Sequence, residues 1–360
     1  MSLVNNETVH IDCRHFKGDL PCIPHKNTGV KCVNCPQYSP VDKRILIIKL
    51  GAIGDVIRTT PLLRKMRIEF PNSRIYWLTK SPEVLPNDAV DNILPYNLES
   101  ITYLQHASFD ILVNLDKDLD ACSLARGIHS TEKFGFTLKH GVVYPFNEEA
   151  NHKYLTGLFD DLSKSNVLSY PQEIFNIMGW KFQGEEYVFD NQEQLGITWD
   201  LPQGKKIGLN TGCGDRWTTR LWPEEHWIEL IQKLSSSGFV PILLGGPQED
   251  EKNTSLSKKT GAFYPGYFDL PAFINLMDQM DLIVTQVTMA MHIAVALRKK
   301  LVLMNNIFNR HEFDLYGRGE LLEPSVACEC YFSGKCKMGA SCMKDLSPAS
   351  VLQSVLKQLS

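Results

Sequence analysis

The chain has 360 residues, enough for two ordinary domains, and its 43% hydrophobic and 22% charged residues are typical of a globular protein. Its formal net charge of −4 excludes a general electrostatic attraction to nucleic acid or to an anionic membrane surface. We find no apolar run of about 18 residues and therefore expect no transmembrane helix. The polar N-terminus lacks the apolar core of a signal peptide, which favours a cytoplasmic protein.

Residues 1–42 are polar, turn-rich and rich in cysteine. They contain too few apolar residues to build a core of their own, so another factor must order them. We therefore expect a cysteine-rich extension over residues 1–42, followed by the first folded domain.

The first half of the chain alternates apolar runs with helical patterns. "RILIIKL" at residues 44–50 is a continuous apolar run, as expected for a strand buried on both faces. Helical spacing of apolar residues follows over residues 56–70. Further strands are expected at residues 74–79, 91–96 and 109–116. This alternation predicts a parallel sheet with right-handed crossovers.

The same pattern starts again after a mixed helical stretch near residues 154–178. A helix is expected over residues 223–238, with Pro223 and two glutamates in its first turn and Gly238 at its end. Strands are expected at residues 205–212, 240–246, 281–286 and 299–306, a buried helix at 290–297 and an amphipathic helix at 347–359. The sequence therefore predicts two α/β halves in tandem, with a boundary between about 180 and 203.

Glycine turns follow three of the predicted strands, at residues 51–55, 211–214 and 245–247. Ligands of open α/β sheets bind beyond the carboxyl ends of the strands, where small residues let backbone N–H groups approach a phosphate. Each turn alone is equally typical of an ordinary strand-to-helix connection. None matches the dinucleotide fingerprint or the P-loop.

Taken together, these segments resemble a known family. "KLGAIGDVIRTTP" (49–61) is similar to the signature of glycosyltransferase family 9, the ADP-heptose heptosyltransferases of bacterial lipopolysaccharide assembly. "LNTGCGDRWTTRLWPEEHWIELIQKL" (209–234), "ILLGGPQEDE" (242–251) and "VTQVTMAMHIAVAL" (284–297) resemble its later motifs, in the same order. The resemblance implies a GT-B fold in which two Rossmann-like domains face a cleft. It implies an acceptor domain at 43–185, a nucleotide-sugar domain at 186–345, and a C-terminal helix at 346–360 that crosses back to the first domain.

By position in the first motif, Asp55 corresponds to the general base of this family. An inverting transferase must remove a proton from the acceptor hydroxyl, and a carboxylate within hydrogen-bond reach can do so. A negative charge also favours the oxocarbenium-like transition state. The alternative is that Asp55 caps the helix that follows, and the two roles are compatible.

The resemblance also implies the residues that bind the donor. Arg220 corresponds to the basic residue that compensates the departing diphosphate, so no Mg²⁺ is expected to be required. The alternative for Arg220 is a surface ion pair with Glu224 or Glu225. The expected donor-binding residues are Gly54, Thr211, Gly212, Arg216, Glu249, Thr288, Met289 and His292. Glu249 is assigned to the donor ribose or, alternatively, to a solvated acidic run, and Trp217, Trp222 and Trp227 are expected to be packing residues.

The fourth motif departs from the family pattern. Val287 replaces the usual acid and Met289 replaces the usual glycine, so the donor or its affinity is expected to differ. Thr288 and His292 remain as candidates, although a histidine in an apolar helix is as often a core residue as a ligand.

Eight of the ten cysteines lie near the two ends of the chain, where such groups in a reducing compartment favour metal ligation. The expected ligands are Cys13, Cys22, Cys32 and Cys35 in one group, and Cys328, Cys330, Cys336 and Cys342 in the other. Structural zinc is expected, with iron or an iron–sulfur cluster as the alternative and free buried cysteines as the third possibility.

The leading hypothesis is thus an inverting transferase that moves heptose from ADP-heptose to a lipopolysaccharide-type glycan or glycolipid or, as in some relatives, to a protein. Its expected location is the cytoplasm or the inner face of the inner membrane, with at most peripheral membrane association and no nucleic-acid partner. A transferase that uses a UDP-sugar is the second hypothesis. A non-catalytic sugar-nucleotide-binding metalloprotein is the third, and the presence of Asp55 and Arg220 argues against it.

Overall fold

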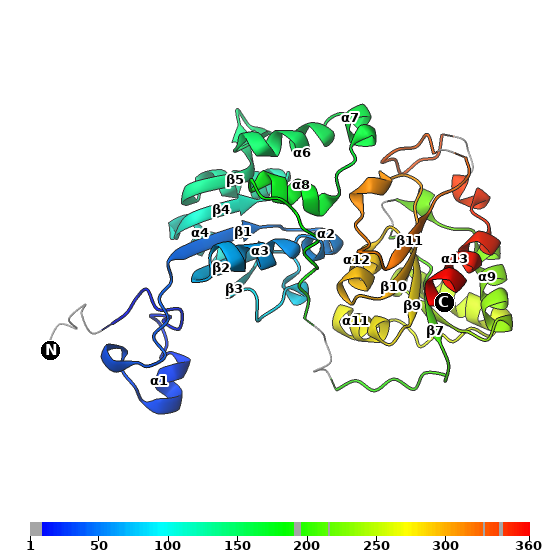
Figure 1. Ribbon diagram of the computed structural model, residues 1–360, viewed down its shortest axis with the longest axis horizontal. Helices are drawn as coiled ribbons and strands as arrows, with labels where there is room; N and C mark the ends of the chain where they lie inside the picture. Colours follow the sequence, from blue (N-terminus) through cyan, green and yellow to red (C-terminus); the bar gives the residue numbers. More distant parts are fainter. Residues whose placement is uncertain (1–8, 191–195, 215–216, 327, 338–340) are drawn as a thin grey trace. The chain divides into compact units, whose positions relative to one another are not determined.

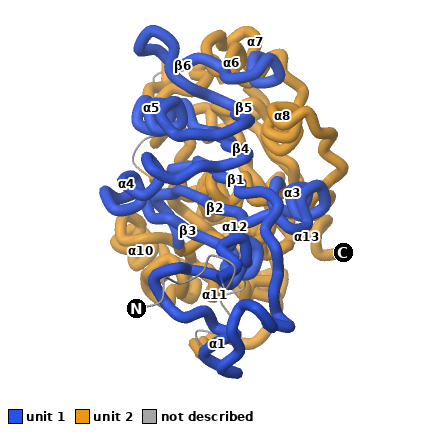
Figure 2. The backbone as a smooth tube through the Cα atoms, turned by 90° about the vertical axis from the view of Figure 1, so that its left-hand side faces the viewer, with its two compact units in different colours: residues 1–51, 62–82, 86–151 blue, residues 52–61, 83–85, 152–360 orange. Residues whose placement is uncertain are grey.

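The computed structural model describes residues 9–190, 196–214, 217–326, 328–337 and 341–360 (Figure 1). The chain forms two compact units, which Figure 2 distinguishes by colour. The first unit comprises residues 1–51, 62–82 and 86–151, and the second comprises residues 52–61, 83–85 and 152–360. Each unit has its own sheet, as the alternating sequence pattern predicts.

The sheet of the first unit has the strand order β3-β2-β1-β4-β5-β6. Its first five strands in the chain are parallel, and β6 runs antiparallel to β5. The strands are β1 (Lys43–Ile48), β2 (Ser73–Thr79), β3 (Asn92–Pro95), β4 (Ser108–Asn114), β5 (His129–Lys139) and β6 (Val142–Pro145). Leu46, Ile48 and Leu112 are fully buried in its core, which explains why β1 and β4 have continuous apolar runs.

Helices α3 (Pro61–Glu69), α4 (Leu98–His106) and α5 (Leu119–Gly127) connect these strands, with short 3₁₀ turns η3 (Pro82–Val84) and η4 (Glu148–Ala150). Before β1, the described residues 9–42 form α1 (Ile23–Thr28), η2 (Cys32–Asn34) and an isolated antiparallel bridge between Cys13 and Pro40. Large apolar side chains of this extension, including Ile11 and Ile23, are about two-thirds exposed. The extension has little core of its own, as the sequence predicts, and Arg14 ties it to Asp91 of the first unit.

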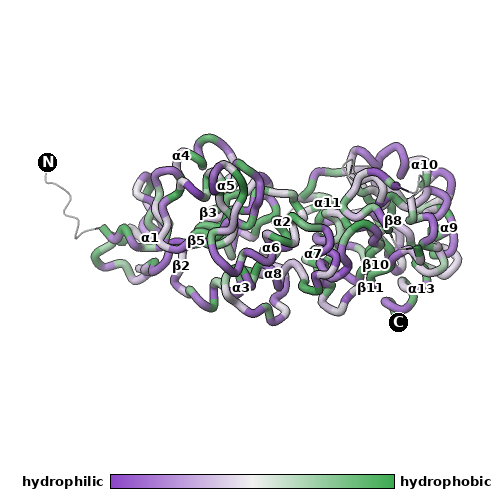
Figure 3. The backbone as a smooth tube through the Cα atoms, turned by 90° about the horizontal axis from the view of Figure 1, so that it is seen from above, coloured by the Kyte–Doolittle hydropathy of each residue, from purple (hydrophilic) through white to green (hydrophobic). Residues whose placement is uncertain are grey.

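The sheet of the second unit is entirely parallel and has the order β11-β10-β9-β7-β8. Its strands are β7 (Lys206–Asn210), β8 (Val240–Leu244), β9 (Leu282–Gln286), β10 (Lys300–Met304) and β11 (Gly319–Leu322). The tube in Figure 3 is hydrophobic along β10, whose last four residues are buried. The four strands that the sequence predicts here, β7 to β10, are all present.

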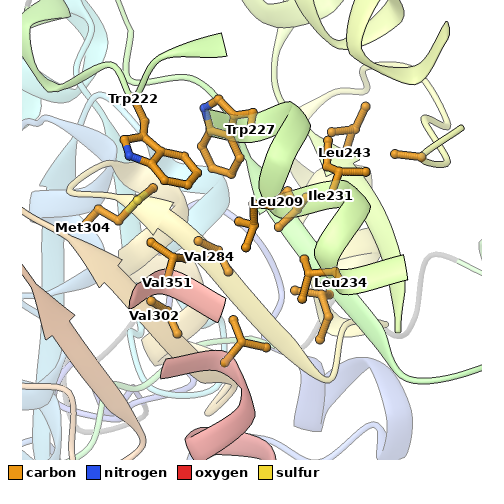
Figure 4. Close-up of a cluster of buried hydrophobic side chains, with 14 of the residues drawn as sticks. Leu209, Trp222, Trp227, Ile231, Leu234, Leu243, Val284, Val302, Met304 and Val351 are labelled. Carbon is orange, nitrogen blue, oxygen red and sulfur yellow. The ribbon is translucent and has the colours of Figure 1, made fainter. Parts of the chain in front are cut away.

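The helices of the second unit are α2 (Ile53–Ile57), α6 (Asn151–Thr156), α7 (Asp160–Ser165), α8 (Tyr170–Ile177), α9 (Glu224–Ser236), α10 (Asp250–Thr260), α11 (Leu270–Asp278), α12 (Met289–Ala296) and α13 (Pro348–Leu359). Its 3₁₀ turns are η6 (Thr218–Arg220), η7 (Pro247–Glu249), η8 (Arg310–Glu312) and η9 (Cys342–Asp345). Trp222 and Trp227 lie edge to face in the core, as Figure 4 shows. Both are packing residues, as predicted.

The division into units differs from the boundaries expected from the sequence. Residues 52–61 and 152–185 belong to the second unit, although they precede the expected boundary. Helix α13 also packs in the second unit, against α9, β10 and β11. Its residues Val351 and Val355 are fully buried in that core, and Figure 4 shows Val351 there. The expected crossing of the last helix to the first domain stays a prediction.

Three strands are not predicted from the sequence. Strand β5 is the longest of the first unit, yet only Gly135, Phe136 and Thr137 are buried in it, so it has no apolar run to reveal it. Strands β6 and β11 have only four residues each. Among the described residues, no helix has the length and apolar character that crossing a bilayer requires.

Candidate active site

The first family motif places Asp55 one turn into α2. The helix begins after Ala52, and Asp55 occupies its third position. The backbone N–H of Ala52 donates a hydrogen bond to Asp55 Oδ2 at 3.3 Å. Asp55 therefore accepts a hydrogen bond from the residue that precedes the helix, as the acid of a capping box does. A third of its side chain remains exposed.

Gly54 allows α2 to pack directly on α12. A Cβ atom built on Gly54 would lie 2.6 Å from Cδ2 of His292, well inside a normal contact distance. His292 is 7% exposed, and burial lowers its pKa to about 3, so its ring is neutral at physiological pH. Gly54 and His292 thus fix the position of the Asp55 turn, in addition to lining the cavity described below.

Asp55 forms an ion pair with Arg58, which ends the same helix. Arg58 Nη2 lies 2.7 Å from Asp55 Oδ1, and Arg58 Nη1 lies 2.7 Å from Glu312 Oε1 on η8. Burial alone would lower the pKa of Arg58, but these two carboxylates outweigh it and raise the pKa. Arg58 and Glu312 are missed by the sequence analysis, although Arg58 lies within the first motif.

The turn after β7 requires a glycine at position 212. A Cβ atom there would lie 1.9 Å from Oε1 of Glu249. Glu249 Oε2 accepts the N–H of Gly246 at 3.0 Å, so its carboxylate joins two of the predicted glycine turns. Glu249 is therefore half-buried and capped onto the Gly246 turn, and its assignment to the donor ribose stays a prediction.

Thr211 does not direct its hydroxyl into the cavity. Its Oγ1 donates to Asn253 Oδ1 at 2.6 Å, and its carbonyl accepts from Lys252 Nζ at 2.9 Å. Thr211 is fully buried, so its contribution to the site is the shape of the turn. Lys252 and Asn253 are two further residues that sequence reasoning misses, since nothing marks them in the α10 sequence.

Thr288 caps α12, whose N-terminus points toward the same region. Its Oγ1 accepts the N–H of Ala290 at 3.2 Å and contacts Asn210 Nδ2 at 3.4 Å. Val287 and Met289, the two departures from the family pattern, lie on either side of it and line the cavity. Arg216, the remaining donor-binding candidate, lies outside the described residues.

Arg220 ends η6 and is 7% exposed. Its Nη2 donates to the carbonyl of Cys213 at 2.6 Å, its Nε donates to that of Trp217 at 3.3 Å, and Phe308 lies under the guanidinium at 5.3 Å. Burial lowers its pKa. Glu224 pairs instead with Lys259, at 2.6 Å. Within the described ranges no carboxylate pairs with Arg220, so the expected alternative of a surface ion pair is not found.

These residues meet at one cavity of about 760 Å³, lined entirely by residues of the second unit. Asp55, Arg58 and Glu312 line it together with Arg220 and the glycine turns at 212–214 and 245–246. Of the predicted residues, those on the cavity wall are Gly54, Asp55, Gly212, Arg220, Glu249, Thr288, Met289 and His292. Trp217, predicted to be a packing residue, also lines the cavity, where its ring packs edge to face on Phe308 and Phe332.

The segment that carries the four C-terminal cysteines contributes Phe332 to this wall. The N–H of Cys330 donates to Cys328 Sγ at 3.3 Å, and that of Lys337 donates to Cys330 Sγ at 3.1 Å. Burial, with the nearby thiols of Cys342 and Cys330, raises the pKa of Cys328 to about 12. The Ser341 hydroxyl donates to the carbonyl of Thr219 at 2.8 Å, which connects the segment to η6.

The four N-terminal cysteines line a hollow of about 820 Å³ together with His10, His15 and His25. Among the described residues, no cysteine forms a disulfide. In the part of the chain that the structure describes, no three His, Cys, Asp or Glu side chains are arranged to hold one metal ion. The structure therefore groups the cysteines without showing a metal site.

The sequence model of the family described as "Glycosyltransferase family 9 (heptosyltransferase)" matches residues 99–312, more than half of the chain. The chain belongs to glycosyltransferase family 9. It is 24% identical over 243 residues to the lipopolysaccharide heptosyltransferase 1 of Escherichia coli O18:K1:H7, which covers 60% of this chain and 71% of that protein. The protein is therefore a heptosyltransferase-like glycosyltransferase.

Solved structures of family 9 proteins have the same fold. E. coli WaaC, solved with ADP-2-deoxy-2-fluoro heptose, matches with a TM-score of 0.61 at 17% identity over 87% of this chain and 99% of that one. TibC, an iron-containing dodecameric heptosyltransferase of enterotoxigenic E. coli, matches with a TM-score of 0.56 at 10% identity over 88% and 76%. The α/β fold, with one parallel and one mostly parallel sheet, is thus that of the GT-B heptosyltransferases.

Proposed function

We propose that this family 9 enzyme is an inverting glycosyltransferase that moves heptose from ADP-heptose to a glycan acceptor. One observation carries the proposal: Asp55 and Arg220 line the same cavity, one as an acceptor of protons and the other as a buried cation. The donor is suggested by the adenosine diphosphate sugars in the solved structures of WaaC and TibC.

In the proposed reaction, Asp55 takes the proton of the acceptor hydroxyl as its oxygen attacks the anomeric carbon of the donor. The new carbon–oxygen bond forms on the face opposite the departing diphosphate, so the configuration at that carbon inverts. The bond from the anomeric carbon to the diphosphate oxygen breaks, and ADP leaves with the electron pair. The negative charge of the Asp55 turn also favours the oxocarbenium-like transition state.

Arg220 is proposed to stabilise the departing diphosphate. A buried guanidinium with no carboxylate partner among the described residues is costly unless an anion occupies the adjacent space. The glycine turns at residues 212–214 and 245–246 add backbone N–H groups, which bind phosphate well. We therefore expect turnover without a requirement for Mg²⁺.

The acceptor is proposed to be a lipopolysaccharide-type glycan or glycolipid, as the names of the E. coli relatives suggest. A protein acceptor is the alternative. Because an anionic nucleotide-sugar does not cross a bilayer unaided, we place the reaction in the cytoplasm or at the inner face of the inner membrane. Any membrane association would then be peripheral.

The test is release of ADP from ADP-heptose by the full-length protein in the presence of a core oligosaccharide acceptor, with a UDP-sugar in a parallel reaction. Asp55→Asn should lower kcat by about 10²- to 10⁴-fold, the usual contribution of a general base. Asp281→Asn is the matched control, because Asp281 also accepts a backbone N–H, from Lys206 at 2.7 Å, but does not line the cavity.

Retained turnover in Asp55→Asn would exclude the proposed base. Turnover only with the UDP-sugar would support a different donor. Val287 and Met289 on the cavity wall, which depart from the family pattern, are the reason for testing this alternative. No turnover with either donor, but tight binding of one, would support the non-catalytic alternative.

We also propose a structural metal at each cysteine group. Four thiols within a 15-residue segment, connected through Cys328 and Cys330, suit zinc or iron at the C-terminal group. The shared hollow of Cys13, Cys22, Cys32 and Cys35 suggests the same for the coreless extension. Bound metal would hold these segments in place and would supply no step of the transfer.

Elemental analysis and native mass spectrometry of the full-length protein test the metal proposal. We expect one metal equivalent to disappear in Cys342→Ser and another in Cys35→Ser, whereas Cys122→Ser, which changes a buried cysteine outside both groups, should retain both. Zinc, iron, and iron with sulfide are distinguished by the same measurement. A metal-free protein that is folded and active would exclude the proposal.

A further inference from the structure

The strongest unassigned feature of the site is the guanidinium of Arg58, which lies between two carboxylates from distant parts of the chain. Its Nη2 pairs with Asp55 Oδ1 and its Nη1 with Glu312 Oε1, each at 2.7 Å, across 254 residues of sequence in the second case. The ring of Tyr170 lies 3.8 Å from the guanidinium carbon. The Arg58 side chain is only 13% exposed, so both pairs are sheltered from solvent screening.

This arrangement fixes the side chain of Asp55 by both of its oxygens. Oδ1 accepts from Arg58, and Oδ2 accepts the N–H of Ala52 over a long 3.3 Å. A base that must meet a hydroxyl in one geometry loses rate when its carboxylate can rotate. Arg58 is itself held, because Glu312 and Tyr170 contact it from other elements and Tyr170 hydrogen-bonds to Thr59 at 2.9 Å.

The same contacts set the charge beside the cavity. Asp55 and Glu312 carry two negative charges and Arg58 one positive charge, so the three groups together carry a net −1. Among the residues that the structure describes, further titratable groups near Asp55 include His292 on α12, whose ring is neutral, and the phenols of Tyr170 and Tyr187. Without Arg58 the two carboxylates would face an anionic donor with a net charge of −2.

We propose that Arg58 is the positioning residue of the catalytic base and that Glu312 is its second anchor. This inference rests on the proposed function, in which Asp55 is the base.

The test compares Arg58→Met, Arg58→Lys and Glu312→Gln with the wild-type protein in the ADP-release assay, over a range of pH. Arg58→Met should lower kcat by about 100-fold, the cost of misplacing a catalytic group by about 1 Å, with little change in KM for the donor. The acidic limb of its kcat profile should move to higher pH by about one unit or more, because a neighbouring cation favours the charged form of a carboxyl group.

Arg58→Lys keeps the charge but cannot bridge two carboxylates with a planar fork, so it should restore the pH profile and only part of kcat. Glu312→Gln keeps the pair with Asp55 and should cost less than Arg58→Met. Arg318→Met is the control: Arg318 makes a comparable two-bond ion pair with Glu186 at 2.6 and 2.7 Å, but neither lines the cavity. It should lower stability without moving the pH profile.

The outcomes separate this inference from the function on which it rests. If Asp55→Asn is inactive while Arg58→Met keeps kcat within about threefold and an unchanged pH profile, the positioning role is wrong and the base remains. If Asp55→Asn is active, the proposed function itself fails. If Arg58→Met does not fold, Arg58→Lys decides, because a full wild-type kcat in that variant would exclude a need for the bridging geometry.

Discussion

The close contact between Gly54 and His292 predicts that Gly54→Ala changes stability in a direction that depends on whether residue 292 carries its imidazole ring. In Gly54→Ala the new Cβ would lie 2.6 Å from Cδ2 of His292 and 3.5 Å from Cγ and Nε2. Carbon atoms normally stay about 3.5–4.0 Å apart, so α2 and the buried ring would have to separate by about 1 Å. Overpacking of this kind typically costs about 1–3 kcal/mol.

Helix propensity acts in the opposite direction, because alanine is favoured over glycine in a helix by up to about 1 kcal/mol. Overpacking and helix propensity can be separated by introducing Gly54→Ala both in the wild-type protein and in His292→Ala, which lacks the imidazole ring. Gly54→Ala should destabilise the wild-type protein but should be neutral or stabilising in His292→Ala, where the methyl group has room. Gly51→Ala is the control, since no atom lies within 4 Å of a Cβ built there.

Urea unfolding of the four proteins of this cycle, followed by circular dichroism, measures the coupling. We expect an interaction of about 1–2 kcal/mol, well above the 0.3–0.5 kcal/mol of independent sites. Equal destabilisation by Gly54→Ala in both backgrounds would refute the reasoning, because it would show that the ring does not limit the approach of α2. The ADP-release assay on the same variants should show the loss of kcat that follows from moving Asp55.

Two further predictions concern buried charge. The folded-state pKa of His292, about 3, is below its unfolded value of about 6.5, so the unfolded chain binds more protons in this window and stability should fall as the pH falls from about 6.5 toward 3. In thermal unfolding over that range His292→Gln should therefore depend less steeply on pH than the wild type, and parallel curves would contradict the assignment of a neutral, buried ring. Glu173 is 2% exposed and pairs with Lys153 at 2.5 Å, while Asn166 Nδ2 and the Thr156 hydroxyl also donate to it at 3.2 and 3.4 Å. Lys153→Met removes the close cation and leaves those two hydrogen bonds, so it should cost about 1.5–3 kcal/mol in urea unfolding. Lys259→Met, which breaks the exposed pair with Glu224, should cost at most about 1 kcal/mol, and similar losses in the two variants would contradict the burial argument.

The sequence predicts the parts of this fold that depend on continuous burial. Strands β1, β4, β7, β9 and β10 are apolar along their length because both faces are covered, and all five are found near their expected positions. Strand β5 is missed because most of its residues are not buried, and its pairing with β4 is a property of the sheet. Local sequence cannot show a strand that tertiary pairing creates.

The residues of the candidate site also differ in how far the local sequence reveals them. Asp55 and Arg220 can be found because each lies in a motif with a recognisable order, and Arg58 could have been found three residues after Asp55. Glu312 has no signal of its own, since its partner lies 254 residues earlier. Thr211 lies in a recognisable motif, yet the motif does not reveal what its side chain does. Its hydroxyl donates to Asn253, and no local sequence pattern predicts that partner.

The membership of α2 in the second unit has a consequence for the proposed reaction. The chain leaves β1 at the end of the first unit, yet residues 52–61 pack with α12 and with Glu312. Asp55 and the residues proposed to bind the donor, Arg220, Gly212 and Glu249, therefore line a cavity whose walls belong to one compact unit. The contact of Gly54 with His292 and the ion pairs of Arg58 then set where the base stands relative to the site of the departing diphosphate. A substitution that loosens either contact should lower kcat even though it removes no group that touches the donor.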